Sequence, residues 1–448
     1  MPNLKIISLV AILATGLFAV NNNGYFTKAN TKKSLSISYN NLNDEEQDTF
    51  MLGRSFFTIP WVEAPSATTA RDGLGPLFNA NTCINCHQNN SLGSVYNKDG
   101  KFSRSMVARL SIPSTNSKEH QEILKKAGFI PEPVYGAQVS INGTRTIPYE
   151  AKLHIDYKDK KVIYPDGNIV VLRNPSYSLK ELNYGALSKN TSISVRKAPP
   201  LVGLGLLENL SDEAILANVD EDDKNLDGIS GRANLVYSVE SKNYKVGRYT
   251  YKASAPSVKH QSAGAFINDM GLTTTLFPNE NCTSAQEKCL NAPKPRDPID
   301  VPDNRLDAVT FYLTHLKVPK SKISVKEGKK LFNKIGCVSC HVSSFTTKNG
   351  ITINPYTDFL LHDMGESLSD GRSEFRASAN EWKTAPLWGI NSYEKTIRKK
   401  PDYLHDGRAR NLEEAILWHG GEAQASKKSF MSLEKAQREL LIKFIGTL

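Results

Sequence analysis

Two short motifs of cysteine and histidine carry the clearest chemistry in this sequence. Each reads Cys-x-x-Cys-His, and the two copies lie far apart in the chain. Such a motif can form a dithiol redox site, one half of a zinc site or an attachment point for covalent haem. The residues concerned are Cys83, Cys86 and His87 in the first copy and Cys337, Cys340 and His341 in the second.

The histidine that directly follows the second cysteine distinguishes these readings. A redox dithiol needs no histidine there, and a four-ligand zinc site would need two closely spaced pairs. In covalent haem attachment, both thiols form thioethers and the next residue supplies the proximal imidazole. Because the two copies use four of the six cysteines, the sequence predicts two c-type haems, with His87 and His341 as proximal iron ligands.

The other two cysteines, Cys282 and Cys289, are separated by six residues. In an oxidising compartment we expect them to form a disulfide, which would stabilise the short loop by roughly 2–3 kcal/mol in the chain-entropy model. A redox-active pair is the alternative.

An acid-rich string at residues 223–228 resembles the first half of an EF-hand calcium loop. Asp223, Asn225 and Asp227 would supply oxygen ligands at alternate positions, before a glycine at the sharp turn. The bidentate glutamate of such a loop is missing, since Asn234 stands in its place. The string therefore indicates a Ca²⁺ site, with a simple acid-rich turn as the alternative.

Helical segments around the motifs would position the haems. Apolar residues recur at helical spacing in residues 307–316 and again in residues 439–448, and each segment would close one unit. The string Leu-Phe-Asn precedes each motif at the same offset, at residues 77–79 and 331–333. This predicts an apolar helix leading into each haem turn. The sequence therefore predicts a mainly α protein with two cytochrome c-type haem domains that arose by internal duplication.

The first unit is much longer than the second, and the excess is predicted to be a mixed, β-rich insertion at about residues 130–300. Alternating, tyrosine-rich runs at residues 160–164 and 247–252 predict strands. Pro165-Asp166-Gly167 predicts a turn after the first of them. The predicted domains are residues 23–320, which include the insertion, and residues 321–448.

The N-terminus predicts export. An apolar run at residues 6–20 is short for a membrane span and typical of a signal-peptide core. Residues 1–22 are therefore predicted to be a signal peptide, or an uncleaved anchor that would be the one membrane tether. Either reading places the protein in the bacterial periplasm, which suits covalent haem attachment.

The charge balance does not point to nucleic acid. The 448 residues include 56 Lys and Arg against 46 Asp and Glu, a formal net charge of +10, but the basic residues are scattered. The composition is otherwise that of an ordinary globular protein. A solvated surface explains the charge, and an acidic partner is the alternative. We expect a small redox carrier, a cytochrome c or a cupredoxin, as the electron donor.

The chain resembles the bacterial di-haem cytochrome c peroxidase superfamily. The resemblance rests on the haem motifs, the duplicated unit, and Tyr-Leu-His-Asp-Gly at residues 403–407 followed by Leu-Glu-Glu-Ala at residues 412–415. Longer strings resemble the di-haem oxidoreductase branch, which is often labelled a predicted thiol oxidoreductase. These strings occupy residues 203–208, 227–232, 263–266, 356–365 and 416–423.

The resemblance implies that the second haem feeds electrons to the first, where peroxide or another oxidant is reduced. It places the distal ligand of the second haem shortly after the Leu-x-Glu-Ala string. This chain has His419 there, where the peroxidases usually have methionine. Bis-imidazole ligation by His341 and His419 is therefore implied. His405 would lie near the edge of the second haem without binding its iron.

Three further residues each have two possible interpretations. Arg408 and Arg410 would either pair with haem propionates or lie on the surface. Trp388 would either pack in the core or lie on the second haem as an electron relay. Related di-haem peroxidases also bind Ca²⁺ between their domains, which adds support to the calcium reading above.

The distal side of the first haem determines the function, but the resemblance identifies no distal ligand in this chain. Met106, His120, His260 and Met270 are the candidates, and an open site beside Gln261 fits equally well. An open iron would permit peroxide or O2 chemistry, whereas a filled one would favour a dedicated electron-transfer cytochrome. Oxidation of an organic or protein substrate at the haem is a third reading.

Overall fold

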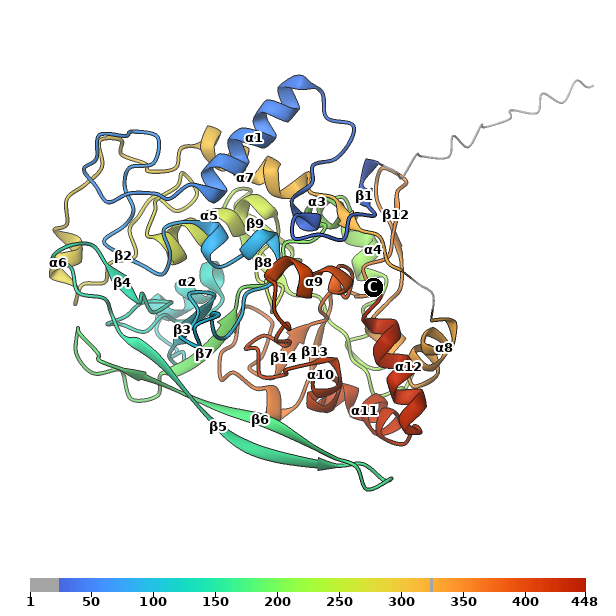
Figure 1. Cartoon of the computed structure of the whole chain (residues 1–448). Coiled ribbons are helices and arrows are strands. Elements are labelled where there is room, and N and C mark those ends of the chain that lie inside the picture. The colour runs from blue at the N-terminus through green and yellow to red at the C-terminus, as the bar shows by residue number, and fades with distance from the viewer. Residues whose placement is uncertain (1–23, 323–324) are drawn as a thin grey trace, which may run out of the picture.

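The computed structural model describes residues 24–322 and 325–448 (Figure 1). The predicted signal peptide or anchor at residues 1–22 lies outside this part of the chain. Helices account for 30% and strands and bridges for 19% of the described residues, and the strands pair into small two-stranded sheets. The fold is therefore mixed α/β, and the expectation of a mainly α protein holds only in part. In the described ranges, no helix is both long and apolar enough to cross a membrane.

Helices α1 (Asp44–Thr58) and α7 (Asp303–Thr314) pack against each other near the first motif (Figure 1). Asn43 begins α1 as part of a capping box, which satisfies backbone N–H groups at the helix start. Gly53 approaches α7 so closely that a Cβ there would lie 1.8 Å from the carbonyl oxygen of Ala308. Glycine is therefore required where the two helices cross.

Helices α8 (Lys326–Lys334) and α12 (Lys435–Ile445) repeat this arrangement near the second motif. A Cβ on Gly328 of α8 would lie 2.3 Å from a backbone carbonyl oxygen of α12. The closing helices that the sequence predicts are confirmed as α7 and α12. Each helix pair contributes to its own hydrophobic core, one with Cys83 at its edge and the other with Cys337.

The segment just before the first motif is not the predicted helix. Leu77–Phe78 form strand β2, which pairs antiparallel with β4 (Asn142–Gly143), whereas Leu331 to Asn333 do lie in α8. Three prolines interrupt the stretch between α1 and the motif, and proline lacks the N–H group that a helix interior needs. The leading helix of the first unit is instead α1, which ends well before the motif.

A long hairpin projects from the predicted insertion. Strand β5 (Lys152–Ile163) pairs antiparallel with β6 (Ile169–Lys180), and Gly167 adopts a φ of 82° in the turn between them. Only glycine adopts this conformation without strain. The predicted strand at residues 160–164 and the turn that follows it are confirmed.

This hairpin packs along the second unit (Figure 1). The hydroxyl of Tyr177 in β6 donates to the carboxylate of Asp406 at 2.6 Å. Arg173 pairs with Asp402 at 3.3 Å. The insertion therefore supports the region around the second motif, although it belongs to the first unit by sequence.

The run at residues 247–252 is not the predicted strand. Strands β8 (Leu235–Ser238) and β9 (Asn243–Val246) form a short hairpin that ends before it. The run instead forms a tight loop closed by a single bridge between Tyr249 and Ala255. Its alternating tyrosines therefore reflect burial in a loop and not the two faces of a strand.

Short elements complete the fold, and Cys282 and Cys289 are joined in a disulfide. The strand pairs are β1 (Phe26–Thr27) with β10 (Val318–Pro319), β3 (Met106–Ser111) with β7 (Ser192–Lys197), β11 (Phe345–Thr346) with β12 (Thr352–Ile353), and β13 (Leu361–Asp363) with β14 (Glu381–Lys383). The helices are α2 (Lys118–Ala127), α3 (Leu204–Glu208), α4 (Asp212–Leu216), α5 (Val258–Met270), α6 (Glu287–Leu290), α9 (Ile390–Ile397), α10 (Leu412–Trp418) and α11 (Gln424–Met431). The 3-10 turns are η2 (Ser34–Ser36), η3 (Cys83–Asn85), η4 (Gln88–Asn90), η5 (Cys337–Ser339), η6 (Glu366–Leu368) and η7 (Gly421–Ala423).

Candidate haem-binding site

An apolar cavity of about 280 Å³ lies beside α8 and the second motif. Cys337, Cys340 and His341 line it from the motif, and His419 lines it from the end of α10. The structure thus brings together the four residues predicted for the second haem. Most of the remaining wall is apolar and includes Phe332, Leu368, Pro386, Leu387, Ile390 and Ile416.

The two histidines predicted to ligate the second haem, His341 and His419, are held in the same way. Nδ1 of His341 lies 2.9 Å from the carbonyl oxygen of Tyr356, and Nδ1 of His419 lies 2.7 Å from that of Ala415. A carbonyl partner on Nδ1 fixes the tautomer and leaves Nε2 for a metal. Burial lowers the pKa of His341 to about 4 and also lowers the pKa of His419. Both rings are therefore neutral, which is the form that ligates a metal.

The first motif lies against the other core and repeats this pattern. Cys83, Cys86 and His87 gather at the turn η3, and Nδ1 of His87 lies 2.9 Å from the carbonyl oxygen of Pro199. Burial lowers the pKa of His87 to about 4. The sulfur of Cys86 lies 3.1 Å from the carbonyl oxygen of Arg104. The first motif can therefore also offer a neutral imidazole through Nε2.

The distal candidates for the first motif lie in different environments. His120 lies at the start of the polar helix α2, where its Nδ1 accepts a backbone N–H. Met106 is buried in β3, and Met270 ends α5 inside the first core. His260, in the first turn of α5 and next to Gln261, has an Nδ1 with no hydrogen-bond partner among the described residues. Burial lowers the pKa of His260 to about 4, so its imidazole is neutral.

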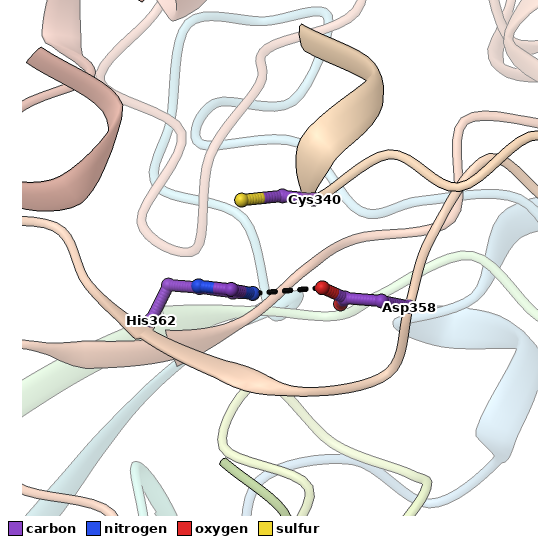
Figure 2. A group of neighbouring side chains, drawn as sticks. All are labelled: Cys340, Asp358 and His362. Atoms are coloured by element: carbon purple, nitrogen blue, oxygen red, sulfur yellow. Dashed lines mark hydrogen bonds and ion pairs between the residues drawn. The ribbon is translucent and has the colours of Figure 1, made fainter. Parts of the chain in front are cut away.

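A buried charge cluster surrounds His362, which lines the cavity; Figure 2 shows His362 with Asp358 and Cys340. Nε2 of His362 lies 2.8 Å from Oδ2 of Asp358, and its Nδ1 lies 2.6 Å from Oε2 of Glu422. Burial alone would lower the pKa of His362, but hydrogen bonds with Asp358, Cys340 and Glu422 raise it to about 12. His362 is therefore a buried cation between two carboxylates.

The same cluster contains donor atoms of the kind that bind metals. The sulfur of Cys340, a carboxylate oxygen of Asp358 and a ring nitrogen of His362 lie within 4.8 Å of one another. However, both ring nitrogens of His362 already face carboxylates, and the sulfur of Cys340 is an atom predicted to join the haem. We therefore interpret the cluster as an electrostatic part of the cavity wall. Sequence spacing carried no signal for it.

Lysine side chains bring further positive charge to this cavity. Lys197, Lys383 and Lys427 all line it. The ammonium group of Lys197 donates to the carbonyl of Asp402, and that of Lys383 donates to the carbonyl of Thr384 at 3.4 Å. Burial lowers the pKa of Lys197 to about 7 and that of Lys383 to about 8. Buried ammonium groups on neutral carbonyls favour an anionic ligand, and haem carries carboxylates.

The arginines near the Tyr-Leu-His-Asp-Gly string are already paired. Arg408 lies 2.7 Å from a carboxylate oxygen of Asp406, and Arg410 lies 2.7 Å from one of Glu414. These carboxylates neutralise both guanidinium groups, so the structure favours neither arginine as a partner of haem propionates. The sequence indicated the arginines because they follow the string, whereas Lys197 and Lys383 belong to no recognisable motif.

The core-packing reading of Trp388 is confirmed, and a different tryptophan lines the cavity. Trp388 packs in the first core, and it is Trp382 that lines the cavity. His405 also lines the cavity and stacks on Trp382, with 3.8 Å between the ring centroids. The ammonium group of Lys252 lies 4.3 Å from the centroid of the Trp382 ring. This cation disfavours a positive charge on the indole, so Trp382 suits a structural wall better than an oxidised relay.

The predicted calcium loop forms a turn whose side-chain oxygens bond to its own backbone. Oδ1 of Asp223 and Oδ1 of Asn225 both accept from the N–H of Asp227. Oδ1 of Asp227 in turn accepts from the N–H of Ile229. These bonds are those of an acid-rich turn, and calcium binding at this loop stays a prediction.

The two motif-bearing units and the cavity with paired histidines define a candidate di-haem protein. A family model described as "Di-haem oxidoreductase, putative peroxidase" matches residues 19–448. The chain belongs to this di-haem oxidoreductase family, which confirms the resemblance seen in the sequence, and membership implies two haems.

Other comparisons add a distant likeness. Among solved structures, the chain is similar to hydrazine synthase of Kuenenia stuttgartiensis, pressurised with 20 bar xenon, with 15% sequence identity and a TM-score of 0.30. The match covers 57% of this chain and 73% of that chain. No curated protein matches the chain.

Proposed function

We propose that this protein is an exported, periplasmic di-haem c-type cytochrome that reduces peroxide or a related oxidant. One observation carries the proposal. His341 and His419, each with a backbone carbonyl on Nδ1, line the same apolar cavity as Cys337 and Cys340. This arrangement suits covalent attachment and bis-imidazole ligation of a haem there.

Each predicted residue then has a defined task. A bound haem supplies reversible one-electron iron chemistry. The cysteines anchor it, the imidazoles hold its iron, and the backbone carbonyls orient the imidazoles. The apolar wall excludes water, which strengthens the effect of nearby charges. The thioether cysteines are Cys83, Cys86, Cys337 and Cys340, and the iron ligands are His87, His341 and His419.

A short path joins the two regions. The carbonyl of Pro199 accepts from Nδ1 of His87, and the next residue, Pro200, lines the cavity of the second motif. One hydrogen bond and one peptide unit therefore separate the first imidazole from the second cavity. We propose this backbone segment, and not the cation-covered Trp382, as the electron path between the sites.

The overall reaction would be peroxide reduction. A small carrier, a cytochrome c or a cupredoxin, would deliver two electrons through the second site. Peroxide at the first site would take up these electrons together with two protons from water and leave as two water molecules. A side chain close to Nε2 of His87 would determine whether peroxide reaches a bound haem, and the neutral, half-buried His260 is one candidate for that position.

Spectroscopy of the holoprotein tests this function. We expect the ferric electronic and electron paramagnetic resonance spectra to contain one low-spin, bis-imidazole haem and one haem that reacts with hydrogen peroxide after partial reduction. A reduced carrier should then be oxidised at two equivalents per peroxide. Two low-spin haems that do not react with peroxide would instead indicate a dedicated electron-transfer cytochrome. Oxidation of an added organic or protein substrate without consumption of carrier would indicate the oxidase reading.

The buried lysines allow a second test. Lys383→Met should lower the reduction potential of the second haem, because a nearby positive charge favours the less positive ferrous state. The expected shift is on the order of tens of millivolts, because a unit charge at the cavity wall acts through an effective dielectric constant of about 20. Spectroelectrochemical titration would measure it. Lys395→Met, at an exposed position of α9, should leave the potential unchanged because solvent screens that charge.

A further inference from the structure

A second, much smaller cavity lies where the loop after α1 meets the segment before α7. Thr69 and Asp72 line it from the loop after α1, and Pro295, Arg296, Asp297 and Asp300 line it from the segment before α7. Its volume of about 10 Å³ is close to that of one water-sized sphere. The cavity therefore has room for a single small species.

Two buried carboxylates line this space, and each has one oxygen without a hydrogen-bond partner among the described residues. Asp72 is 4% exposed and Asp300 is 5% exposed. Oδ1 of Asp72 accepts from the N–H of Gly73 at 3.0 Å, and Oδ2 of Asp300 accepts from the N–H and hydroxyl of Thr273 at 2.8 and 2.7 Å. Oδ2 of Asp72 and Oδ1 of Asp300 have no hydrogen-bond partner among the described residues. Such buried, unpaired oxygens are costly.

The neighbouring arginines contact other groups and not the side-chain oxygens of Asp72 and Asp300. Arg71 donates to the hydroxyl of Ser55 and lies over the ring of Phe56. Arg305 donates to the backbone carbonyl of Asp300 at 3.0 Å, not to its carboxylate. Arg296 lines the cavity, but its side chain is exposed and free to move into solvent. The two carboxylates therefore lack an ordinary protein counterion.

We propose that Asp72 and Asp300 bind a divalent cation, specifically Ca²⁺, between these two loops. The lining offers carboxylate and hydroxyl oxygens, without a histidine or cysteine among the cavity residues. Hard oxygen donors select Ca²⁺ or Mg²⁺ over transition metals, and irregular loops suit the flexible coordination of Ca²⁺ better than the strict octahedron of Mg²⁺. Thr69 and Asp297, both exposed, also line this cavity and could contribute further oxygens.

The charge of the pair supports a cation at this position. Burial raises the pKa of Asp300 to about 6, the hydrogen bonds from Thr273 oppose this rise, and the negative charges of Glu280 and Asp72 add to it. A cation between the oxygens would remove this repulsion. It would also tie the loop after α1 to the chain entering α7, which are the two helices packed near the first motif. This proposal does not depend on the proposed oxidoreductase function.

Binding of Ca²⁺ to the chelator-treated holoprotein tests the proposal. Equilibrium dialysis with radioactive Ca²⁺ should show saturable binding that falls at least tenfold in Asp72→Asn/Asp300→Asn, and Ca²⁺ should raise the melting temperature of wild type but not of this variant. Asp159→Asn, at an exposed position of β5, is the matched control and should bind as wild type does, whereas Asp227→Asn tests the EF-hand-like loop as the competing site. The single variant Asp72→Asn replaces the double variant if the latter fails to fold.

Several outcomes would overturn this assignment. Unchanged binding in the Asp72 and Asp300 variants would do so, as would loss of binding in Asp227→Asn alone. If wild type binds no Ca²⁺, a proton on Asp300 explains the unpaired oxygens and the cation is rejected. If Mg²⁺ competes at equal concentration, the assignment to Ca²⁺ is rejected.

Discussion

Replacing His419 with alanine is expected to convert the second haem from low spin to high spin. The imidazole of His419 lines the cavity with that of His341, and each leaves Nε2 available for iron. Two nitrogen ligands give a strong axial field, and loss of one leaves a weaker water ligand or an open position. The ferric electronic and electron paramagnetic resonance spectra should show that all of the second haem has changed from low spin to high spin.

Two companion variants make this result specific. His405→Ala changes another histidine in the same cavity, but His405 stacks on Trp382, so the haem should remain low spin. His419→Met should restore six-coordinate iron with a higher reduction potential, since a thioether ligand raises the potential of a haem. An unchanged low-spin spectrum in His419→Ala would refute the ligand assignment, and so would a high-spin haem in His405→Ala alone.

Replacing His362 with glutamine is expected to destabilise the holoprotein by about 3–5 kcal/mol. The imidazolium lies between the carboxylates of Asp358 and Glu422. Removing one partner of a buried ion pair leaves uncompensated charge, and costs of this size are typical. Urea unfolding, followed by the haem spectrum and by circular dichroism, would measure the free energy of unfolding of both proteins.

The pH dependence distinguishes charge from packing in this variant. Because the carboxylates of Asp358 and Glu422 raise the folded pKa of His362 above its unfolded pKa of about 6.5, its contribution is complete below pH 6.5. It declines as the pH rises through the range between these values, by at most about 1.4 kcal/mol per pH unit. The difference in the free energy of unfolding between wild type and His362→Gln should therefore become smaller above pH 6.5. A difference that does not change with pH would indicate that the variant is destabilised by lost packing and not by lost charge.

Controls for this prediction exist in the same chain. His154 is an exposed histidine whose Nε2 lies 3.2 Å from Asp156, and His154→Gln should cost less than about 1 kcal/mol, as surface ion pairs do. The double variant His362→Gln/Glu422→Gln should recover part of the lost stability, because it removes one of the uncompensated carboxylates. If the double variant is no more stable than His362→Gln, the buried carboxylates are not the source of the lost stability.

The sequence by itself determined those parts of this protein that depend on local spacing. The positions of the cysteines and histidines in each motif, the closing helices α7 and α12, and the turn at Gly167 all follow from short patterns. Counting from the Leu-x-Glu-Ala string also located His419, which lines the same cavity as the second motif. These features are contained in a few consecutive residues, so no knowledge of the fold was needed.

Tertiary structure alone decided the rest, because distant segments had to meet. Leu77 and Phe78 form a strand because residues 142–143 pair with them, a partner that a local helical pattern cannot reveal. Lys197 and Lys383 reach the cavity from β7 and β14, while the nearer arginines are neutralised by carboxylates. Only folding brings the unpaired oxygens of Asp72 and Asp300 to one small space, because burial and the absence of a partner are properties of three-dimensional neighbours.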